Sequence, residues 1–121
     1  MNLGDRMKLY EQAEAGRCLI PMLPAFARLD GRCFHSFTKN LSRPFDEDLH
    51  DAMVNTTKLL IKETNAVLGY TQSDEITLMW YSPDFESQIF FAGNIHKMVS
   101  ILSALTSTNF IKECQKTDRL S

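Results

Sequence analysis

Two long segments of the chain carry apolar and small residues at helical spacing, and strand-like runs lie before and between them. We expect a helix in each segment, and Gly69 is expected to end the first one. In the first segment the steps of three and four join Leu49, Met53, Thr56, Leu60, Thr64 and Val67. In the second, which starts near Asn94 and should end about Phe110, they join Ile95, Met98, Val99, Leu102, Leu105 and Thr106.

Three segments are predicted to be strands. The first covers residues 25–29, with Asp30 at its end and Gly31 breaking the run. A short strand at residues 70–72 and a strong strand at 76–81 follow the first helix, joined by the turn Ser73-Asp74-Glu75. A brief extended stretch is expected at residues 89–91.

The order strand, helix, strand, strand, helix predicts an α+β fold. It is the ferredoxin-like, split βαβ plan of a polymerase palm without its last strand. We expect one domain over residues 1–110 and an irregular tail over 111–121. The strand that lacks its neighbour leaves an uncovered sheet edge, which favours association with another chain.

Composition excludes several classes of protein. No apolar run approaches the roughly 20 residues that cross a bilayer, and residues 1–17 lack a secretory apolar region. The three cysteines, Cys18, Cys33 and Cys114, are far apart, which argues against a disulfide framework and a zinc knuckle. We therefore expect no membrane contact and a cytoplasmic location. A net charge of −2 neither suggests nor excludes RNA.

Asp30 and Asp74 are predicted to meet, although they are far apart in sequence. In the split βαβ plan the first two strands are parallel, so the end of one and the turn leaving the other lie at one edge of the sheet. Two carboxylates a few ångströms apart repel each other by about 1 kcal/mol in water and about 4 kcal/mol at an effective dielectric near 20. A raised pKa or bound Mg²⁺ would offset that repulsion.

Each acidic turn also has a plain structural explanation, because Ser, Asp and Gly are favoured in turns. The joint placement of Asp30 and Asp74 favours a cation site over turn chemistry alone. Two ions about 3.5 to 4 Å apart can clamp the attacking and leaving oxygens of a phosphoryl transfer, as in a nucleotide-polymerising palm.

Four ordered motifs resemble the tRNA-His guanylyltransferase superfamily. They are RLDGRCFHSF (residues 28–37), RPFDE (43–47), GYTQSDEITLMW (69–80) and HKMVSILSALTS (96–107), and GDRMKLYE (4–11) most resembles the bacterial-type guanylyltransferase-like branch. The resemblance covers nearly the whole chain through Phe110. It implies a palm that uses ATP and GTP to add nucleotides in the 3'-to-5' direction to the 5' end of tRNA. Guanylylation of tRNA-His and repair of 5'-truncated tRNA are both implied, as is a dimer or tetramer.

The resemblance also implies a set of site residues. Asp30 and Asp74 would hold two Mg²⁺ ions, with the Gly31 carbonyl as a further ligand, and Glu75 would complete the catalytic carboxylates by supporting the turn. The Ser73 hydroxyl would face phosphates together with the backbone amides of Arg32, Cys33, Phe34 and His35.

Arg43, Asp46 and Lys97 match nucleotide-contacting positions of the family. Each has an alternative, because Arg43 could be a loop charge, Asp46 a helix N-cap and Lys97 a solvated helix position. Among the aromatic residues, Phe34 and Trp80 are expected in the core rather than in base stacking.

Two functions of different class follow. The chain is either the N-terminal part of a tRNA nucleotidyltransferase, or a non-catalytic module that binds Mg-nucleotide and oligomerises through its open sheet edge. A nucleotide cyclase on the same plan is disfavoured, because the SDE and RPFDE motifs follow the guanylyltransferase pattern.

Overall fold

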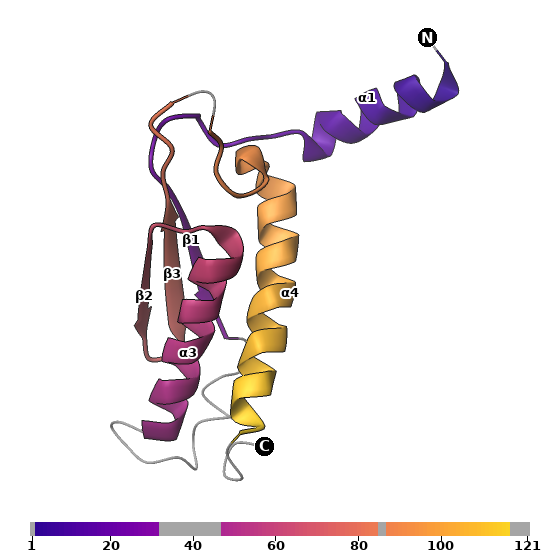
Figure 1. Ribbon diagram of the computed structural model, residues 1–121. Helices are drawn as coiled ribbons and strands as arrows, with labels where there is room; N and C mark the ends of the chain where they lie inside the picture. The colour runs from indigo at the N-terminus through magenta and orange to yellow at the C-terminus, as the bar shows by residue number, and fades with distance from the viewer. Residues whose placement is uncertain (1, 32–46, 85–86, 117–121) are drawn as a thin grey trace.

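A three-stranded sheet with two helices against one face forms the body of the protein (Figure 1). The computed structural model describes residues 2–31, 47–84 and 87–116. In chain order the described elements are α1, β1, α3, β2, β3, the 3-10 turn η1 and α4. This is the predicted α+β order, with one additional helix at the N-terminal end.

The sheet has the order β1-β3-β2, and both outer strands run antiparallel to β3. Its strands are β1 (Ala25–Asp30), β2 (Leu68–Gln72) and β3 (Glu75–Trp80). Because β1 and β2 are each antiparallel to β3, they are parallel to one another, as predicted. Among the described residues the sheet has three strands, and β1 pairs with β3 alone.

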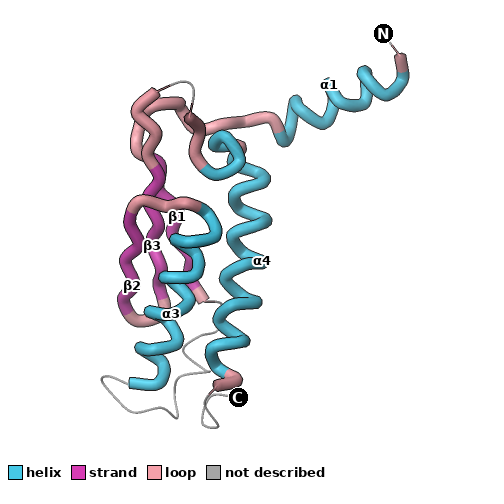
Figure 2. Tube along the Cα trace, in the orientation of Figure 1, coloured by secondary structure: helices cyan, strands magenta, loops and turns pink. Residues whose placement is uncertain are grey.

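The two helices that cover the sheet are α3 (Glu47–Thr64) and α4 (Ile95–Cys114). Side chains of β3 alternate, and Ile76, Leu78 and Trp80 point into the core that α3 and α4 close with Leu60 and Leu102. The core position predicted for Trp80 is confirmed, since the residue is 1% exposed. The opposite face of the sheet carries no described helix (Figures 1 and 2).

The prediction that Gly69 ends the first helix is wrong. The helix ends at Thr64, and Asn65 follows with a φ of 59°, a left-handed conformation that Asn tolerates. Gly69 lies in β2, where a Cβ atom would come within 2.7 Å of the Ile61 side chain and 2.8 Å of Thr57. Val67, placed on the buried helical face, is exposed because it lies after the helix, in the connection to β2.

Several other boundaries differ from prediction. The strand β2 starts at Leu68 and not at residue 70, and β3 starts at Glu75, which was expected in the turn. The extended stretch expected at residues 89–91 is wrong for Phe90 and Phe91, which belong to η1 (Phe90–Gly93); Phe91 and Ala92 have φ near +50° and turn the chain into α4. Tyr81 lies beyond the end of β3. The last helix continues to Cys114, so the irregular tail expected from residue 111 is wrong for 111–114.

The helix α1 (Leu3–Ala15) was not predicted, because its apolar residues form no continuous stripe and none of its residues is buried. It projects from the body near the beginning of α4 (Figure 1). The end of α1 and the residues after it are held at the start of α4: Asn94 Nδ2 donates to the Ala15 carbonyl at 3.1 Å, and the Ile95 amide donates to the Arg17 carbonyl at 3.0 Å. No described helix is long and apolar enough to span a membrane.

Candidate functional site

The predicted acidic residues gather at the end of the sheet where β1 stops and β3 starts. Asp30 and Glu75 are direct partners in the β1–β3 register, and Gln72 is the partner of Glu75 on β2. Ser73 and Asp74 form the two-residue turn between β2 and β3. The convergence follows from topology, because the antiparallel neighbour of the last β1 residue must be an early β3 residue.

A cleft of about 450 Å³ lies between this end of the sheet and α4, and we call it the carboxylate cleft. Asp30, Gly31 and Asp74 contribute to its sheet side. Its α4 side carries the hydroxyl residues Ser103, Thr106 and Ser107, and its apolar part includes Met53, Ile76 and Phe110. The cleft therefore has an apolar surface, on the scale of a small-molecule site, that reaches the end of the sheet where the acids gather. Asp30 lines it as a residue, while its carboxylate contacts Arg28 on the face of β1 that α3 and α4 leave open.

Ser73 has a φ of 55°, a conformation that costs a residue with a side chain roughly 1 to 2 kcal/mol. Its neighbour Asp74 is half-buried and lines the cleft. The hairpin is secured from the β2 side, where Thr71 Oγ1 donates to the Glu75 carbonyl at 3.0 Å. Strain in a turn that carries site residues is a recurring property of functional loops.

Arg28 is a part of this constellation that the sequence reading missed. It lies two residues before Asp30, so both side chains project from the same face of β1. Its Nε is 3.2 Å from Asp30 Oδ2, and its terminal NH2 nitrogen is 4.0 Å from Glu75 Oε1. The spacing of two residues within a strand was the signal that could have identified it.

The α4 hydroxyls were also missed as site residues. Thr106 was expected on the buried helical face, and its Oγ1 is buried without a hydrogen-bond partner among the described residues. With Ser103 and Ser107 it places hydroxyl residues on the α4 wall of the cleft. Their steps of three and four along one helix were the available signal.

Lys97 is not brought to the carboxylates. It lies in the first turn of α4, with Nζ 6.0 Å from the centre of the Phe91 ring, whereas the cleft is lined by the later turns of the helix. Lys97 and Thr106 are separated by about 14 Å along the axis. Six further predicted contacts lie outside the described residues: Arg32, Cys33, Phe34, His35, Arg43 and Asp46.

The donors at the acidic edge match Mg²⁺ in kind. Two Asp carboxylates and the Gly31 carbonyl offer oxygen atoms, and a hard cation prefers oxygen. Within residues 2–31, 47–84 and 87–116, no three or more His, Cys, Asp or Glu side chains form a group that could hold a metal by itself. A small number of protein ligands is typical of Mg²⁺, which keeps several waters and binds substrate phosphates. A structural Zn²⁺ site, by contrast, is closed by four protein ligands.

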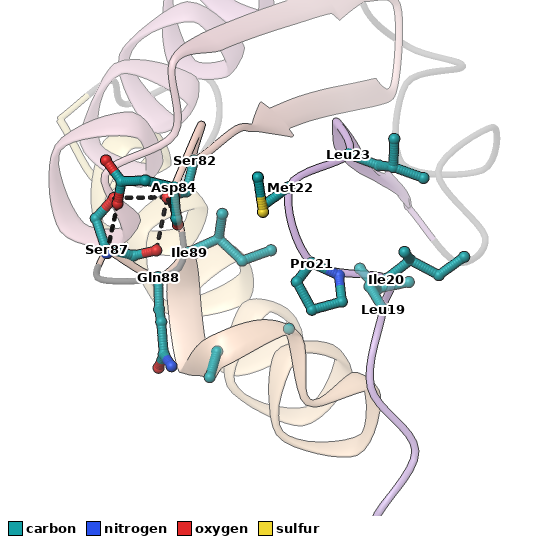
Figure 3. Close-up of a pocket in the computed structure, with 12 residues that line it drawn as sticks. Leu19, Ile20, Pro21, Met22, Leu23, Ser82, Asp84, Ser87, Gln88 and Ile89 are labelled. Atoms are coloured by element: carbon teal, nitrogen blue, oxygen red, sulfur yellow. Dashed lines mark hydrogen bonds between the residues drawn. The ribbon is translucent and has the colours of Figure 1, made fainter.

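A second, smaller pocket of about 110 Å³ lies at the opposite end of the sheet, where β1 begins and β3 has ended (Figure 3). On one side Ser82, Asp84 and Ser87 are joined by hydrogen bonds, including 2.9 Å from the Ser87 amide to Asp84 Oδ1. On the other side lies the apolar loop that contains Pro21 and Met22 (Figure 3). None of the predicted site residues lines this pocket.

The fold and the acidic edge together define a class, a palm-like α+β protein with two aspartates at the end of its sheet. The model of one family, described as tRNAHis guanylyltransferase, matches residues 4–120. The chain therefore belongs to the tRNAHis guanylyltransferase family, as the sequence motifs indicated.

Individual relatives agree with this assignment. A bacterial tRNA(His) guanylyltransferase (Thg1)-like protein in complex with GTP superposes with a TM-score of 0.85 at 34% identity, over 94% of this chain and 53% of the other. A complex of such a protein with ATP gives the same TM-score and identity, over 95% and 51%.

Two curated sequences are also similar to this chain. An uncharacterized protein of Acanthamoeba polyphaga mimivirus is 38% identical over 89% of this chain and 39% of its own length. The tRNA(His) guanylyltransferase of Schizosaccharomyces pombe is 28% identical over 88% of this chain and 40% of its own length. The chain thus spans about two fifths of these relatives and about half of the solved structures.

Proposed function

We propose that this chain carries the metal-binding part of a nucleotidyltransferase palm. Its reaction is the addition of nucleotides in the 3'-to-5' direction to the 5' end of tRNA, by guanylylation of tRNA-His or repair of 5'-truncated tRNA. The observation that carries the proposal is the carboxylate cleft, which Asp30 and Gly31 of one strand end and Asp74 of a distant hairpin line together. Family membership supports the same reaction.

Asp30, Asp74 and the Gly31 carbonyl would hold Mg²⁺ at this edge. The ions would supply charge stabilisation for the attacking and leaving oxygens of a phosphoryl transfer. Glu75, opposite Asp30 in the register, places a further carboxyl group beside that edge. The apolar surface around Met53 and Phe110 would exclude water from one side of a bound nucleotide.

ATP and GTP are the proposed substrates, and solved relatives are complexes with each of them. Ser73, in the hairpin beside Asp74, would face the phosphates. Lys97 would reach only a part of the nucleotide that extends along α4, away from the carboxylates. Arg32, Cys33, Phe34, His35, Arg43 and Asp46 remain proposed contacts from outside the described residues.

The experiment is an extension assay with 5'-monophosphorylated, truncated tRNA, ATP, GTP and Mg²⁺. The proposed function predicts a product longer at its 5' end, lost on EDTA addition and in Asp30→Asn. A matched control is Asp51→Asn, an exposed acid of α3 that does not line the cleft. An unchanged rate in Asp30→Asn would contradict the role of the cleft.

A second candidate function is a non-catalytic module that binds Mg-nucleotide and oligomerises. The observation that favours it is the edge of β1, which among the described residues pairs with β3 alone. This function predicts nucleotide binding and a dimer or tetramer in light scattering, without extension of tRNA. A homo-oligomer and a cytoplasmic location are part of both proposals.

A further inference from the structure

We propose that Arg28 is a positioning residue that occupies Asp30 until a divalent cation displaces it, and that Glu75 then holds the displaced guanidinium. The inference rests on the proposed function, because it concerns the same acidic edge. It assigns roles to one residue that the sequence reading did not single out and to Glu75, which had been given only a supporting role in the turn.

The geometry that carries the inference is a row of three charged side chains on the open face of the sheet. Asp30 and Glu75 are partners across β1 and β3, so their like charges face each other directly. Arg28 stands beside them with Nε 3.2 Å from Asp30 Oδ2 and its NH2 nitrogen 4.0 Å from Glu75 Oε1. One guanidinium therefore lies between both acids.

The contact to Asp30 is in competition with a cation. Mg²⁺ binds a carboxylate oxygen at 2.0 to 2.1 Å, so an ion on Oδ2, the oxygen that Nε approaches, competes with Arg28 for that atom. Arg28 cannot yield by losing its proton, because a guanidinium stays charged in proteins. An ion on Oδ2 would therefore displace Arg28 from Asp30.

Displacement is feasible because the ion pair is exposed. The side chains of Arg28 and Asp30 are 64% and 48% exposed. Forming an exposed ion pair of this kind is favoured only by a factor of about 1.5 to 5 in its equilibrium constant. The movement is also short, because Glu75 Oε1 is already 4.0 Å from the terminal NH2 nitrogen of Arg28. Arg28 can leave Asp30 and remain on the same face of the sheet.

The arrangement would act as an internal counter-cation. While Arg28 is on Asp30 it offsets the repulsion between the two facing carboxylates. When the cation takes over that task, Arg28 neutralises Glu75 and keeps it from competing for the ion. The cost is weaker cation binding than an unpaired Asp30 would give.

The first test measures the affinity of the 121-residue protein for Mn²⁺ alone, as a Mg²⁺ probe, by electron paramagnetic resonance titration. Binding lost in Asp74→Asn is attributed to this edge. The proposal expects Arg28→Gln to bind Mn²⁺ about 2 to 5-fold tighter than the wild type. The matched control is Lys112→Gln, which removes a positive charge next to Ile111 of the cleft and should change the affinity less.

The second test is a double-mutant cycle. Glu75→Gln removes the residue that receives the displaced guanidinium, so it should weaken Mn²⁺ binding in the wild type and weaken it less in the Arg28→Gln background. Equal effects in the two backgrounds would overturn the role of Glu75. Thermal unfolding of each variant keeps these readouts separate from loss of folding.

The third test follows Arg28 itself through the Nε–H signal in nitrogen NMR spectra. Mg²⁺ should shift this signal in the wild type, and Asp30→Asn should shift it without any cation.

Mn²⁺ binding that is unchanged or weakened by Arg28→Gln, or tightened equally by Lys112→Gln, overturns this inference and leaves the proposed function standing. A wild-type protein that binds no Mn²⁺ at the edge overturns both.

Discussion

Asp30, the last residue of β1, lies directly opposite Glu75, the first residue of β3. A facing pair of carboxylates destabilises an antiparallel sheet, and a third acid, Asp74, is adjacent in the hairpin. Natural proteins keep such conflicts at sites that bind a ligand, where stability is given up for function.

Cation-dependent nucleotide binding should depend on Asp74. In the wild type, GTP with Mg²⁺ should raise the melting temperature and GTP with EDTA should not, because a ligand that binds the folded state stabilises it by about 2.7 kcal/mol at 100 times its Kd. Asp74→Asn should lose the Mg²⁺-dependent part of the rise in differential scanning fluorimetry. An equal rise in Asp74→Asn would contradict the metal assignment, and Asp51→Asn serves as the control.

Replacing Ser73 with glycine should stabilise the fold and weaken nucleotide binding. Glycine accepts the φ of 55° at this position without the side-chain penalty, so the free energy of unfolding should rise by about 1 kcal/mol. The same change removes the hydroxyl proposed to face phosphates, and the GTP-dependent rise in melting temperature should shrink. Asn65→Gly, at φ 59° but away from the hairpin, should leave GTP binding unchanged. A GTP response in Ser73→Gly equal to the wild type would refute the phosphate contact.

Gly69→Ala should destabilise the protein by about 1 to 3 kcal/mol in urea unfolding, because the added methyl group would meet Ile61 at 2.7 Å and Thr57 at 2.8 Å. Gly4→Ala, in the exposed helix α1, meets no atom closer than 3.4 Å and should raise helix content by circular dichroism. If Gly69→Ala were as stable as the wild type, α3 would not pack on β2 as closely as described.

The bond between Trp80 and Thr64 should contribute measurably to stability. Trp80 Nε1 donates to the Thr64 carbonyl at 3.1 Å and lies 3.2 Å from Thr64 Oγ1, while Thr64 Oγ1 itself donates to the Leu60 carbonyl at 2.7 Å. Thr64→Val should lower the free energy of unfolding by about 1 to 3 kcal/mol, since it leaves buried polar groups with fewer partners. Thr64→Ser keeps the hydroxyl and should cost less, and the opposite ranking would show that the methyl group dominates.

The two described cysteines should differ in reactivity. Burial raises the pKa of the Cys114 thiol above its ordinary value, and the neighbouring Glu113 carboxylate adds to the rise, whereas Cys18 is exposed. In a Cys33→Ser background, an alkylating reagent should modify Cys18 first and Cys114 only slowly at pH 8.

The same shift predicts how stability changes at alkaline pH. The folded protein holds the Cys114 proton more tightly than the unfolded chain, so this contribution is complete below the ordinary thiol pKa. It declines as the pH rises from there through the raised folded pKa. Cys114→Ala should flatten that part of the pH profile in urea unfolding, and an unchanged slope would contradict the assignment.

The sequence by itself determined the elements whose signals are local. The steps of three and four in α3 and α4, the alternation in β3 and the order of the elements fixed the α+β class. The order also implied that Asp30 and Asp74 share one end of the sheet, because connection rules restrict the topology. Four motifs in the sequence already resemble the family to which the chain belongs.

Tertiary structure decided what depends on contacts between distant segments. Gly69 gave the same signal as a helix C-cap, and only the approach of Ile61 shows that it serves close packing. The isolated helix α1 lacks a periodic stripe, and its base is held by contacts to Asn94 and Ile95 that no local pattern encodes. The bridge from Arg28 to both Asp30 and Glu75 depends on the register of β1 against β3. A one-residue slip would move every side chain to the other face, so sequence patterns identified the acids and packing set their partners.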